Sequence, residues 1–239
     1  MTVVESAQRF GAATRTRRTR TWAAAVVVVA LGGLGVWIVW FSSLLTVQEV
    51  RVLGAVEVSA DSVRQAAAVP AGIPLARLDT AGIAARVGAL PRVASVEVRR
   101  GWPHVVVVVV TERQPLAVTR DGSSYTYLDA TGARFGSLGA VPAGMALVAA
   151  SSDTSMTSAL GVTSALPAAL RARVATVTAR TRDDVVLRLS DGTTVQWGSP
   201  DQSARKAVVL AALLKVKATF YDVSAPDLPT TRGTGTAKP

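Results

Sequence analysis

The chain offers few side chains that could carry out covalent chemistry. Its 239 residues include no cysteine and a single histidine, His104. Histidine is the usual general base near neutral pH, but His104 lies between Pro103 and a run of valines, where a turn histidine bonded to a backbone group is the simpler assignment. No serine lies in a nucleophile elbow. The sequence therefore predicts a protein that is not an enzyme.

Metal and cofactor sites are equally hard to place. One histidine and no cysteine exclude a zinc-type site, and Asp183 and Asp184 form a charged turn before a strand rather than a cation-binding loop. The glycines of residues 32–35 lie inside an apolar run, where they permit close helix packing or face lipid. Trp102 and Trp197 are expected to fill the core or support turns rather than serve as ligand platforms. We expect no cofactor and no metal.

The element that positions the rest of the chain is an apolar segment. Residues 22–48 contain no Asp, Glu, Lys or Arg. A helix over residues 22–40 would be about 27 Å long, close to the roughly 30 Å hydrocarbon core of a bilayer. We therefore predict one transmembrane helix over residues 22–45. A secretory signal peptide has a shorter apolar region and a small-x-small cleavage site, which is missing here, so the helix should remain attached.

Basic residues before this helix predict its orientation. Residues 1–21 contain five arginines against one acidic residue, Glu5, and short basic flanks stay in the cytoplasm. The same tail should attract anionic lipid head groups. The rest of the net charge of +10 is spread thinly, without a basic cluster interleaved with aromatics, so nucleic acid is not an expected partner. The five arginines are Arg9, Arg15, Arg17, Arg18 and Arg20.

Residues 46–115 show the pattern of a compact α+β module. Apolar residues alternate with polar ones over residues 47–53 and 93–100, which predicts half-buried strands. Two helices are expected between them, capped by Ser59 and Asp79 and ended by Pro70 and Pro91. Six valines at residues 105–110 predict a central strand covered by helices on one side. The predicted order is βααββ.

Residues 116–228 are expected to form a mainly antiparallel β domain with one or two helices. Turn signals at residues 121–122, 129–132 and 191–192 separate short strand-like runs. A helix should begin at Asp201 or Ser203, and residues 166–171 favour a short one. The Ser/Thr/Gly/Ala-rich residues 151–164 predict a mobile surface loop. Residues 220–224 should form the closing strand, and residues 229–239 a disordered tail.

The closing strand could serve as a binding surface. A strand that ends a sheet presents unpaired backbone N–H and C=O groups, which proteins normally block unless a partner uses them. Alternatively, Pro226, Pro229 and the tail protect this edge. The residues alone leave both possibilities open.

Several short motifs resemble a known family. Residues 50–54 (VRVLG), 90–93 (LPRV), 102–103 (WP) and 111–115 (TERQP) follow one predicted membrane span in this order. Together they resemble the POTRA domain of the FtsQ/DivIB cell-division family. Residues 187–192, Gly198, the helix carrying Lys206 and residues 221–226 are similar, more loosely, to the β domain of the same family. The resemblance covers residues 22 to about 228.

The resemblance implies a scaffold of the bacterial divisome that links early and late division proteins at the septum. In this family the late strands of the β domain dock the bitopic proteins FtsB and FtsL, and other divisome membrane proteins are further expected partners. The protein would be a single-pass membrane protein with its N-terminus in the cytoplasm. Two prolines in residues 226–229 weaken the case for regular strand addition there. The implied docking residues are Phe220, Tyr221, Asp222, Val223, Ser224, Ala225 and Pro226.

A second class of function has to be weighed because POTRA modules also occur in envelope secretion and assembly factors. Those proteins bind unfolded polypeptide by strand addition and carry a large C-terminal membrane barrel. No series of lipid-facing, alternating strands of about ten residues fits after residue 116. The division role is therefore our main hypothesis, with the secretion role as its alternative.

Overall fold

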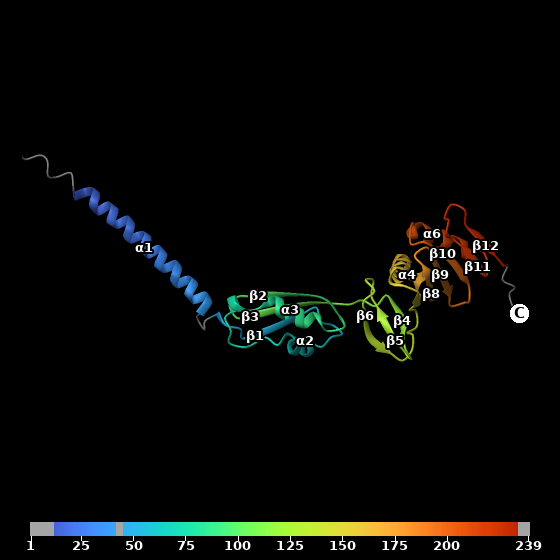
Figure 1. The fold of residues 1–239 in the computed structure, drawn as a ribbon, viewed down its shortest axis with the longest axis horizontal. Coiled ribbons are helices and arrows are strands. Elements are labelled where there is room, and N and C mark those ends of the chain that lie inside the picture. Colours follow the sequence, from blue (N-terminus) through green and yellow to red (C-terminus); the bar gives the residue numbers. More distant parts are fainter. Residues whose placement is uncertain (1–11, 42–44, 234–239) are drawn as a thin grey trace, which may run out of the picture. The chain divides into compact units, whose positions relative to one another are not determined.

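The computed structural model describes residues 12–41 and 45–233, and it divides into two units, residues 1–112 and 113–239 (Figure 1). Helix α1 (Ala12–Phe41) precedes the first domain and starts well before the predicted span. Of the predicted basic tail, residues 1–11 lie outside the described part and residues 12–21 belong to α1. Within the described segments, no helix combines the length and apolar character needed to cross a membrane.

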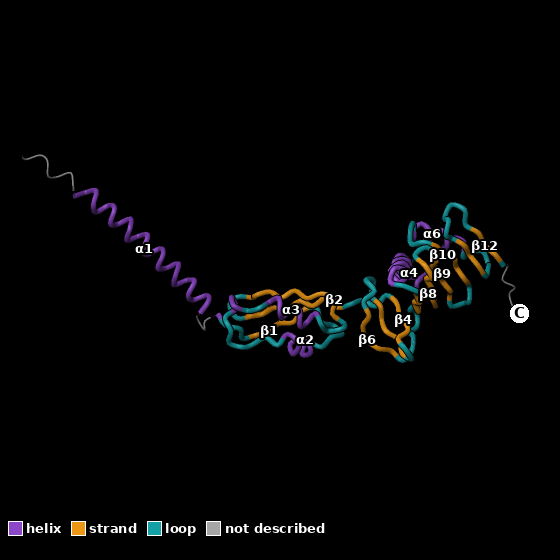
Figure 2. Tube along the Cα trace, in the orientation of Figure 1, coloured by secondary structure: helices purple, strands orange, loops and turns teal. Residues whose placement is uncertain are grey.

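The first globular unit has the predicted βααββ order. Its three-stranded sheet has the order β1-β3-β2, with β1 parallel and β2 antiparallel to the central strand. Figure 2 shows the strands of this unit in orange and its helices in purple. The elements are β1 (Glu49–Leu53), α2 (Ala60–Ala67), the short 3-10 helix η2 (Leu75–Arg77), α3 (Thr80–Gly88), β2 (Val93–Gly101) and β3 (Val105–Glu112).

The valine run forms the centre of this unit because alternate side chains of a strand point to opposite faces. Val106, Val108 and Val110 are buried under α2 and α3, whereas the valines between them are half-buried on the other face. Both helices begin at the predicted caps. The Ser62 amide donates to Ser59 Oγ (3.1 Å), and the Gly82 amide donates to Asp79 Oδ1 (2.9 Å). The prediction that helices cover the valine strand on one side only is therefore confirmed.

A single carboxylate ties the loop after β1 to the end of β3. Glu112 Oε1 accepts hydrogen bonds from the amides of Val56 (2.7 Å), Glu57 (3.0 Å) and Val58 (2.9 Å). Glu112 Oε2 accepts a further bond from the Glu57 amide (3.1 Å). These loop amides face a charged acceptor instead of water, which fixes the path from β1 into α2.

The second unit is built on a nine-stranded sheet with the order β12-β11-β10-β9-β8-β7-β4-β5-β6. Five of its eight strand pairings are antiparallel, as predicted. Its strands are β4 (Ala117–Asp121), β5 (Ser124–Leu128), β6 (Arg134–Leu138), β7 (Leu147–Ala150), β8 (Val174–Thr181), β9 (Asp184–Leu189), β10 (Thr194–Gly198), β11 (Phe220–Asp222) and β12 (Thr230–Arg232).

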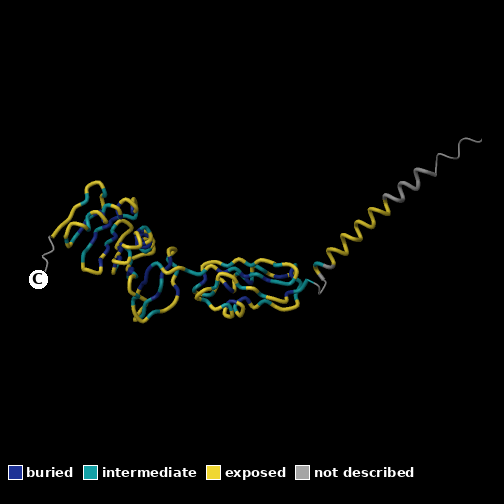
Figure 3. The backbone as a smooth tube through the Cα atoms, turned by 180° about the vertical axis from the view of Figure 1, so that it is seen from behind, coloured by how far each residue is buried: buried dark blue, intermediate teal, exposed yellow. Residues whose placement is uncertain are grey.

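Three helices accompany this sheet rather than the one or two expected: α4 (Asp153–Ala165), α5 (Ala168–Arg171) and α6 (Ser203–Leu213). The predicted loop at residues 151–164 is wrong, because α4 occupies most of it. Side chains of α4 and α6, including Leu160 and Leu210, pack with Leu187 and Val195 of the strands in one core. Figure 3 shows buried segments in the interior of this unit and exposed segments around them.

Candidate partner-binding edge

The closing strand of the prediction, β11, does not end the sheet. It pairs parallel with β10 on one side and antiparallel with β12 on the other. Of the two possibilities that the sequence leaves open, an unpaired edge at residues 220–224 is therefore wrong, and protection of this strand by the tail is confirmed. The tail expected from residue 229 is also wrong in part, since residues 230–232 form β12, whereas residues 234–239 lie outside the described chain.

The seven implied docking residues are not equally accessible. Tyr221 and Val223 are buried against the helices and belong to the core. The Tyr221 hydroxyl donates to the Val216 carbonyl (2.5 Å) and accepts from the Ala218 amide (3.1 Å). Phe220, Asp222 and Pro226 are half-buried, and Ser224 and Ala225 are exposed. A partner could therefore touch only part of this set.

Strand β12 forms the outer edge, and the register shows which of its backbone groups face outward. The Thr194 amide donates to the Thr219 carbonyl (3.0 Å), and the Val223 amide donates to the Gln196 carbonyl (3.0 Å). This alternation directs the backbone of Tyr221 toward β10, so the residues on either side of it bond to β12. Thr231 lies opposite Tyr221. Its N–H and C=O therefore point away from the sheet.

Exposed apolar and charged side chains lie in the connection that leads into β12 and on α6. Leu228, in the connection between β11 and β12, is 80% exposed. Asp227 beside it forms an ion pair with Arg205 of α6. Val208, which follows Arg205 by three residues on the same helix, is 71% exposed. The connection that leads into β12 therefore presents an exposed leucine beside an ion pair with α6.

The Arg232 guanidinium provides a further contact at the edge. It lies over the Phe220 ring, 5.7 Å from the ring centroid. A cation over an aromatic face is attracted by the ring quadrupole, worth about 0.5–1 kcal/mol at an exposed site. This contact holds β12 against β11 on the face opposite the helices.

A buried lysine supports the strands behind the edge. Lys206 of α6 is 2% exposed, and its Nζ donates to the carbonyls of Trp197 (3.1 Å) and Ser199 (2.9 Å). Burial lowers the pKa of Lys206, and nearby carboxylates, including that of Asp201, oppose this shift. Trp197 is fully buried and donates to Ser203 Oγ (3.1 Å), which confirms its predicted place in the core.

Gly198 allows β10 and the end of β11 to approach closely. Its φ is +76°, and a Cβ at this position would lie 2.9 Å from the Ser224 Cβ. A side chain would therefore force the two segments apart. The glycine quoted in the sequence motif has a structural reason: it shapes the turn that Lys206 then holds.

The opposite edge, β6, is irregular. Its pairing with β5 shifts register between Tyr125 and Tyr127, and Gly136 has a φ of +65°. Irregular pairing and bulges are common protections against strand addition. Of the two edges of the described sheet, β12 is therefore the more open to a partner strand.

A fixed turn lies where the chain enters this unit. Asp129 Oδ1 accepts from the Thr131 amide (2.8 Å), the Thr131 hydroxyl (2.6 Å) and the Ala133 amide (3.0 Å). Asp129 Oδ2 accepts from Arg113 Nη1 (2.6 Å). Burial alone would raise the pKa of Asp129, but these donors hold that pKa below its usual value.

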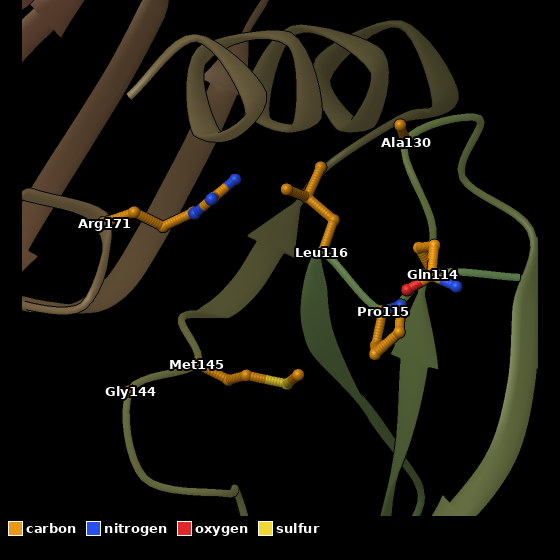
Figure 4. A pocket seen from close by; sticks show the side chains of 7 residues that line it. All are labelled: Gln114, Pro115, Leu116, Ala130, Gly144, Met145 and Arg171. Carbon is orange, nitrogen blue, oxygen red and sulfur yellow. The ribbon is translucent and has the colours of Figure 1, made fainter. Parts of the chain in front are cut away.

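A cavity of about 370 Å³ lies beside this entry turn (Figure 4). In Figure 4 the side chain of Arg171 is directed toward Leu116, and that of Met145 toward Pro115. Its lining includes one charged side chain, Arg171, and no carboxylate or histidine. The cavity thus holds no acid–base pair for catalysis.

The other residues considered for chemistry, His104 and Asp184, lie far apart in the sequence, and each has a separate structural role. His104 lies in the β2–β3 turn, with its Nδ1 3.4 Å from the Thr46 carbonyl. Asp184 begins β9 and accepts from Gln196 Nε2 (3.0 Å). Among the residues that the structure describes, no group of three potential metal ligands comes together.

Sequence reasoning missed β12 and its surroundings. The signal was present in two β-branched residues, Thr230 and Thr231, enclosed by Pro229 and Gly233. The high Pro, Thr and Gly content of the segment concealed it, because that composition is typical of disordered tails. Leu228 also passed unnoticed, since an isolated leucine carries no periodicity.

Comparisons with known proteins match the two units to two domains of the same protein family. Residues 45–113 match the model of the POTRA domain, FtsQ-type, and residues 117–228 match that of Cell division protein FtsQ/DivIB, C-terminal. The chain is 38% identical over 230 residues to Cell division protein FtsQ of Streptomyces bingchenggensis, covering 90% of this chain and 87% of that protein.

Two further relatives extend the comparison. Cell division protein FtsQ of Streptomyces venezuelae is 38% identical over 239 residues, covering 92% of this chain and 88% of that protein. The protein of the same name from Mycolicibacterium smegmatis is 36% identical over 215 residues, covering 88% of this chain and 64% of that protein.

Proposed function

Because the chain belongs to the FtsQ/DivIB family of cell-division proteins, we propose that it is a divisome scaffold that binds a partner strand along the outer edge of β12. The partner we name is an FtsB-like bitopic protein, because the resemblance noted in the sequence implies docking of FtsB and FtsL on the late strands. The single observation that carries the proposal is that, among the described residues, no strand pairs with the outer side of β12, where the backbone groups of Thr231 point.

Strand addition fits the chemistry of this edge. An added strand gains backbone hydrogen bonds from the outward N–H and C=O groups, and side-chain contacts supply specificity. Leu228 offers an aliphatic contact in the connection that leads into β12, and Asp227 beside it is paired with Arg205. The docking surface proposed here therefore consists of Thr230–Arg232 and these flanking side chains, rather than the buried Tyr221 and Val223.

The wider role follows from the same hypothesis. The protein would link early and late division proteins at the septum by holding the partner close to the membrane. Residues 22–45 would cross the membrane once with the N-terminus in the cytoplasm, as their composition predicts. The N-terminal arginines would then lie against anionic lipid on the inner side.

The secretion role considered as an alternative loses its support. It depended on the presence of a POTRA module, and the module matches the FtsQ type. The relatives described above are all named for cell division. No specific observation in the β domain favours polypeptide secretion over partner docking.

Two matched substitutions test the docking edge. Thr231→Pro removes the outward N–H, while Thr230 and Arg232 keep their bonds to β11, so the sheet should remain intact. Thr231→Val keeps the N–H and the β-branched shape and is the control. We expect the FtsB-like partner to bind the proline variant about tenfold more weakly or worse, since a backbone bond is lost and the ring blocks the approach.

Full-length variants produced in the native host give the readout. Recovery of the partner from detergent-solubilised membranes is compared between the two substitutions, together with cell length and septal fluorescence of a tagged protein. Filamentous cells with poor partner recovery should accompany Thr231→Pro only. Equal recovery in both variants would show that the partner does not add to β12.

A further inference from the structure

Trp102 is the aromatic side chain that the proposed docking function leaves unexplained. It lies in the turn between β2 and β3, and its side chain is 51% exposed. Trp197, by contrast, is fully buried. Of the two roles expected for Trp102, filling the core is therefore wrong, and a place in a turn is what the structure shows. An exposed tryptophan leaves a large apolar surface in contact with water, which is unfavourable in free energy unless another surface covers it.

The turn that carries Trp102 lies beside the point where the chain enters the module. The His104 carbonyl accepts from the amide of Gln48 (2.9 Å), and His104 Nδ1 lies 3.4 Å from the Thr46 carbonyl. A second loop reaches the same place, because the Val47 amide donates to the Ile73 carbonyl (3.0 Å). This end of the module thus consists of two loops around its first residues.

Both loops at this end lack charged side chains. Residues 70–74 read Pro-Ala-Gly-Ile-Pro, and residues 101–104 read Gly-Trp-Pro-His. The opposite end of the module carries Glu57, Arg92 and Glu112, with an ion pair between the first two. Charged residues adjoin these loops, but Glu49 is paired with Arg51, and Arg100 donates to the carbonyls of Leu75 (2.7 Å) and Leu78 (2.8 Å). Burying formal charge at a lipid surface is costly, so the two uncharged loops are better suited to approach it than the opposite end.

The length of the connection limits how far this end can lie from the predicted span. Five peptide steps separate Phe41 from Thr46, and a fully extended chain covers at most about 18 Å over that length. If residues 22–45 span the membrane, the loops around Thr46 cannot leave the vicinity of its outer surface.

We infer that the turn at residues 101–104 is a second membrane contact, with the Trp102 indole seated in the head-group region of the outer leaflet. The inference rests on the single-span topology proposed above. An indole suits this region because its ring is apolar and its N–H can bond to water or to a lipid carbonyl. Pro103 beside it adds apolar surface without charge. The contact would limit rotation of the module about its short tether.

Tryptophan fluorescence of the full chain in phospholipid vesicles tests the contact. The chain has five tryptophans, and replacing Trp22, Trp37 and Trp40 with phenylalanine leaves only Trp102 and the buried Trp197. Adding Trp102→Phe gives the matched blank. The difference between the two emission spectra is the signal of Trp102, and circular dichroism confirms that both variants are folded.

Lipids brominated near the head-group end of the acyl chains are the probe. We expect these lipids to quench at least half of the Trp102 fluorescence and to leave the Trp197 fluorescence unchanged. The emission maximum of Trp102 in vesicles should also lie at a shorter wavelength than that of the denatured chain in detergent-free buffer. Unquenched Trp102 in vesicles that retain the protein after a carbonate wash would overturn the contact alone. Release of the protein by carbonate would overturn the topology, and the contact with it.

A protein partner is the competing explanation for Trp102. In that case bromolipids would leave Trp102 unquenched, and Trp102→Ala would reduce recovery of a divisome protein from host membranes. This result would overturn the lipid contact while leaving the β12 docking proposal intact, because Thr231→Pro tests that proposal separately.

Discussion

The carboxylate of Glu112 provides a sharp test of how the POTRA module holds its first loop. Glu112→Ala removes the acceptor of the Val56, Glu57 and Val58 amides without changing the β3 backbone. A hydrogen bond to a charged group contributes roughly 1.5–3 kcal/mol when sheltered; partial solvation here reduces that to about 1 kcal/mol each. The loop should therefore lose about 3 kcal/mol of local stability.

Hydrogen exchange of the full-length protein measures this loss at the amides themselves. Because about 1.4 kcal/mol corresponds to a factor of ten, the three loop amides should exchange about 100-fold faster in Glu112→Ala. Glu112→Gln keeps one acceptor oxygen and should give an intermediate increase. Amides in the centre of β3 should be unaffected.

Glu97→Ala is the matched control. Glu97 lies on the open face of the same sheet, where its carboxylate binds only the exposed Arg99 (2.6 Å). A fully exposed pair of this kind is screened by water, so its removal should leave the loop amides unchanged. Unaltered exchange of residues 56–58 in Glu112→Ala would refute the reasoning, since the loop would then be held by its packing alone.

Three further substitutions test the β domain. Lys206→Met leaves two carbonyls without their donor and should lower the free energy of unfolding, measured by denaturant titration, by about 2–4 kcal/mol. Because burial lowers the Lys206 pKa, the unsubstituted protein should gain stability from this group as the pH rises toward 10.5, and Lys206→Met should lack that gain. Asp129→Asn should lower the denaturant midpoint at neutral pH. The difference should shrink as the pH falls below 3.8, because there the unfolded carboxyl takes up a proton while the depressed pKa still keeps the native one charged. Gly198→Ala should cost about 1–3 kcal/mol, read as a lower melting temperature, because of its positive φ and the Ser224 contact.

The elements of the POTRA module could be predicted because local signals and tertiary packing agree there. The valine run has no polar residue on either face, which restricts it to a central strand. Ser59 and Asp79 cap the helices in the structure as their chemistry suggests. The role of Glu112 could not be predicted, since its three donors lie more than fifty residues earlier in the sequence.

Helix α4 shows where composition misleads. Its segment is rich in Ser, Thr and Gly, residues of modest helix propensity, and therefore resembles a loop. The structure makes it a helix because Leu160 and Val162 are buried against the sheet, and because Ser152 accepts from the Ser155 amide (3.2 Å). Packing of an apolar face outweighs weak propensity. The cap at Ser152 was the available signal.

Strand β12, the proposed docking edge, is the least predictable part of the fold for a reason that bears on the proposed function. A strand of three residues is too short to show a periodic sequence pattern. Strand β12 forms because it pairs with β11 and because Arg232 contacts the Phe220 ring. A segment that pairs with one neighbouring strand makes few native contacts, so few of its residue types are constrained in a way that the sequence would reveal. The same scarcity leaves the backbone of Thr231 unpaired on its outer side, and an added partner strand would complete its hydrogen bonding.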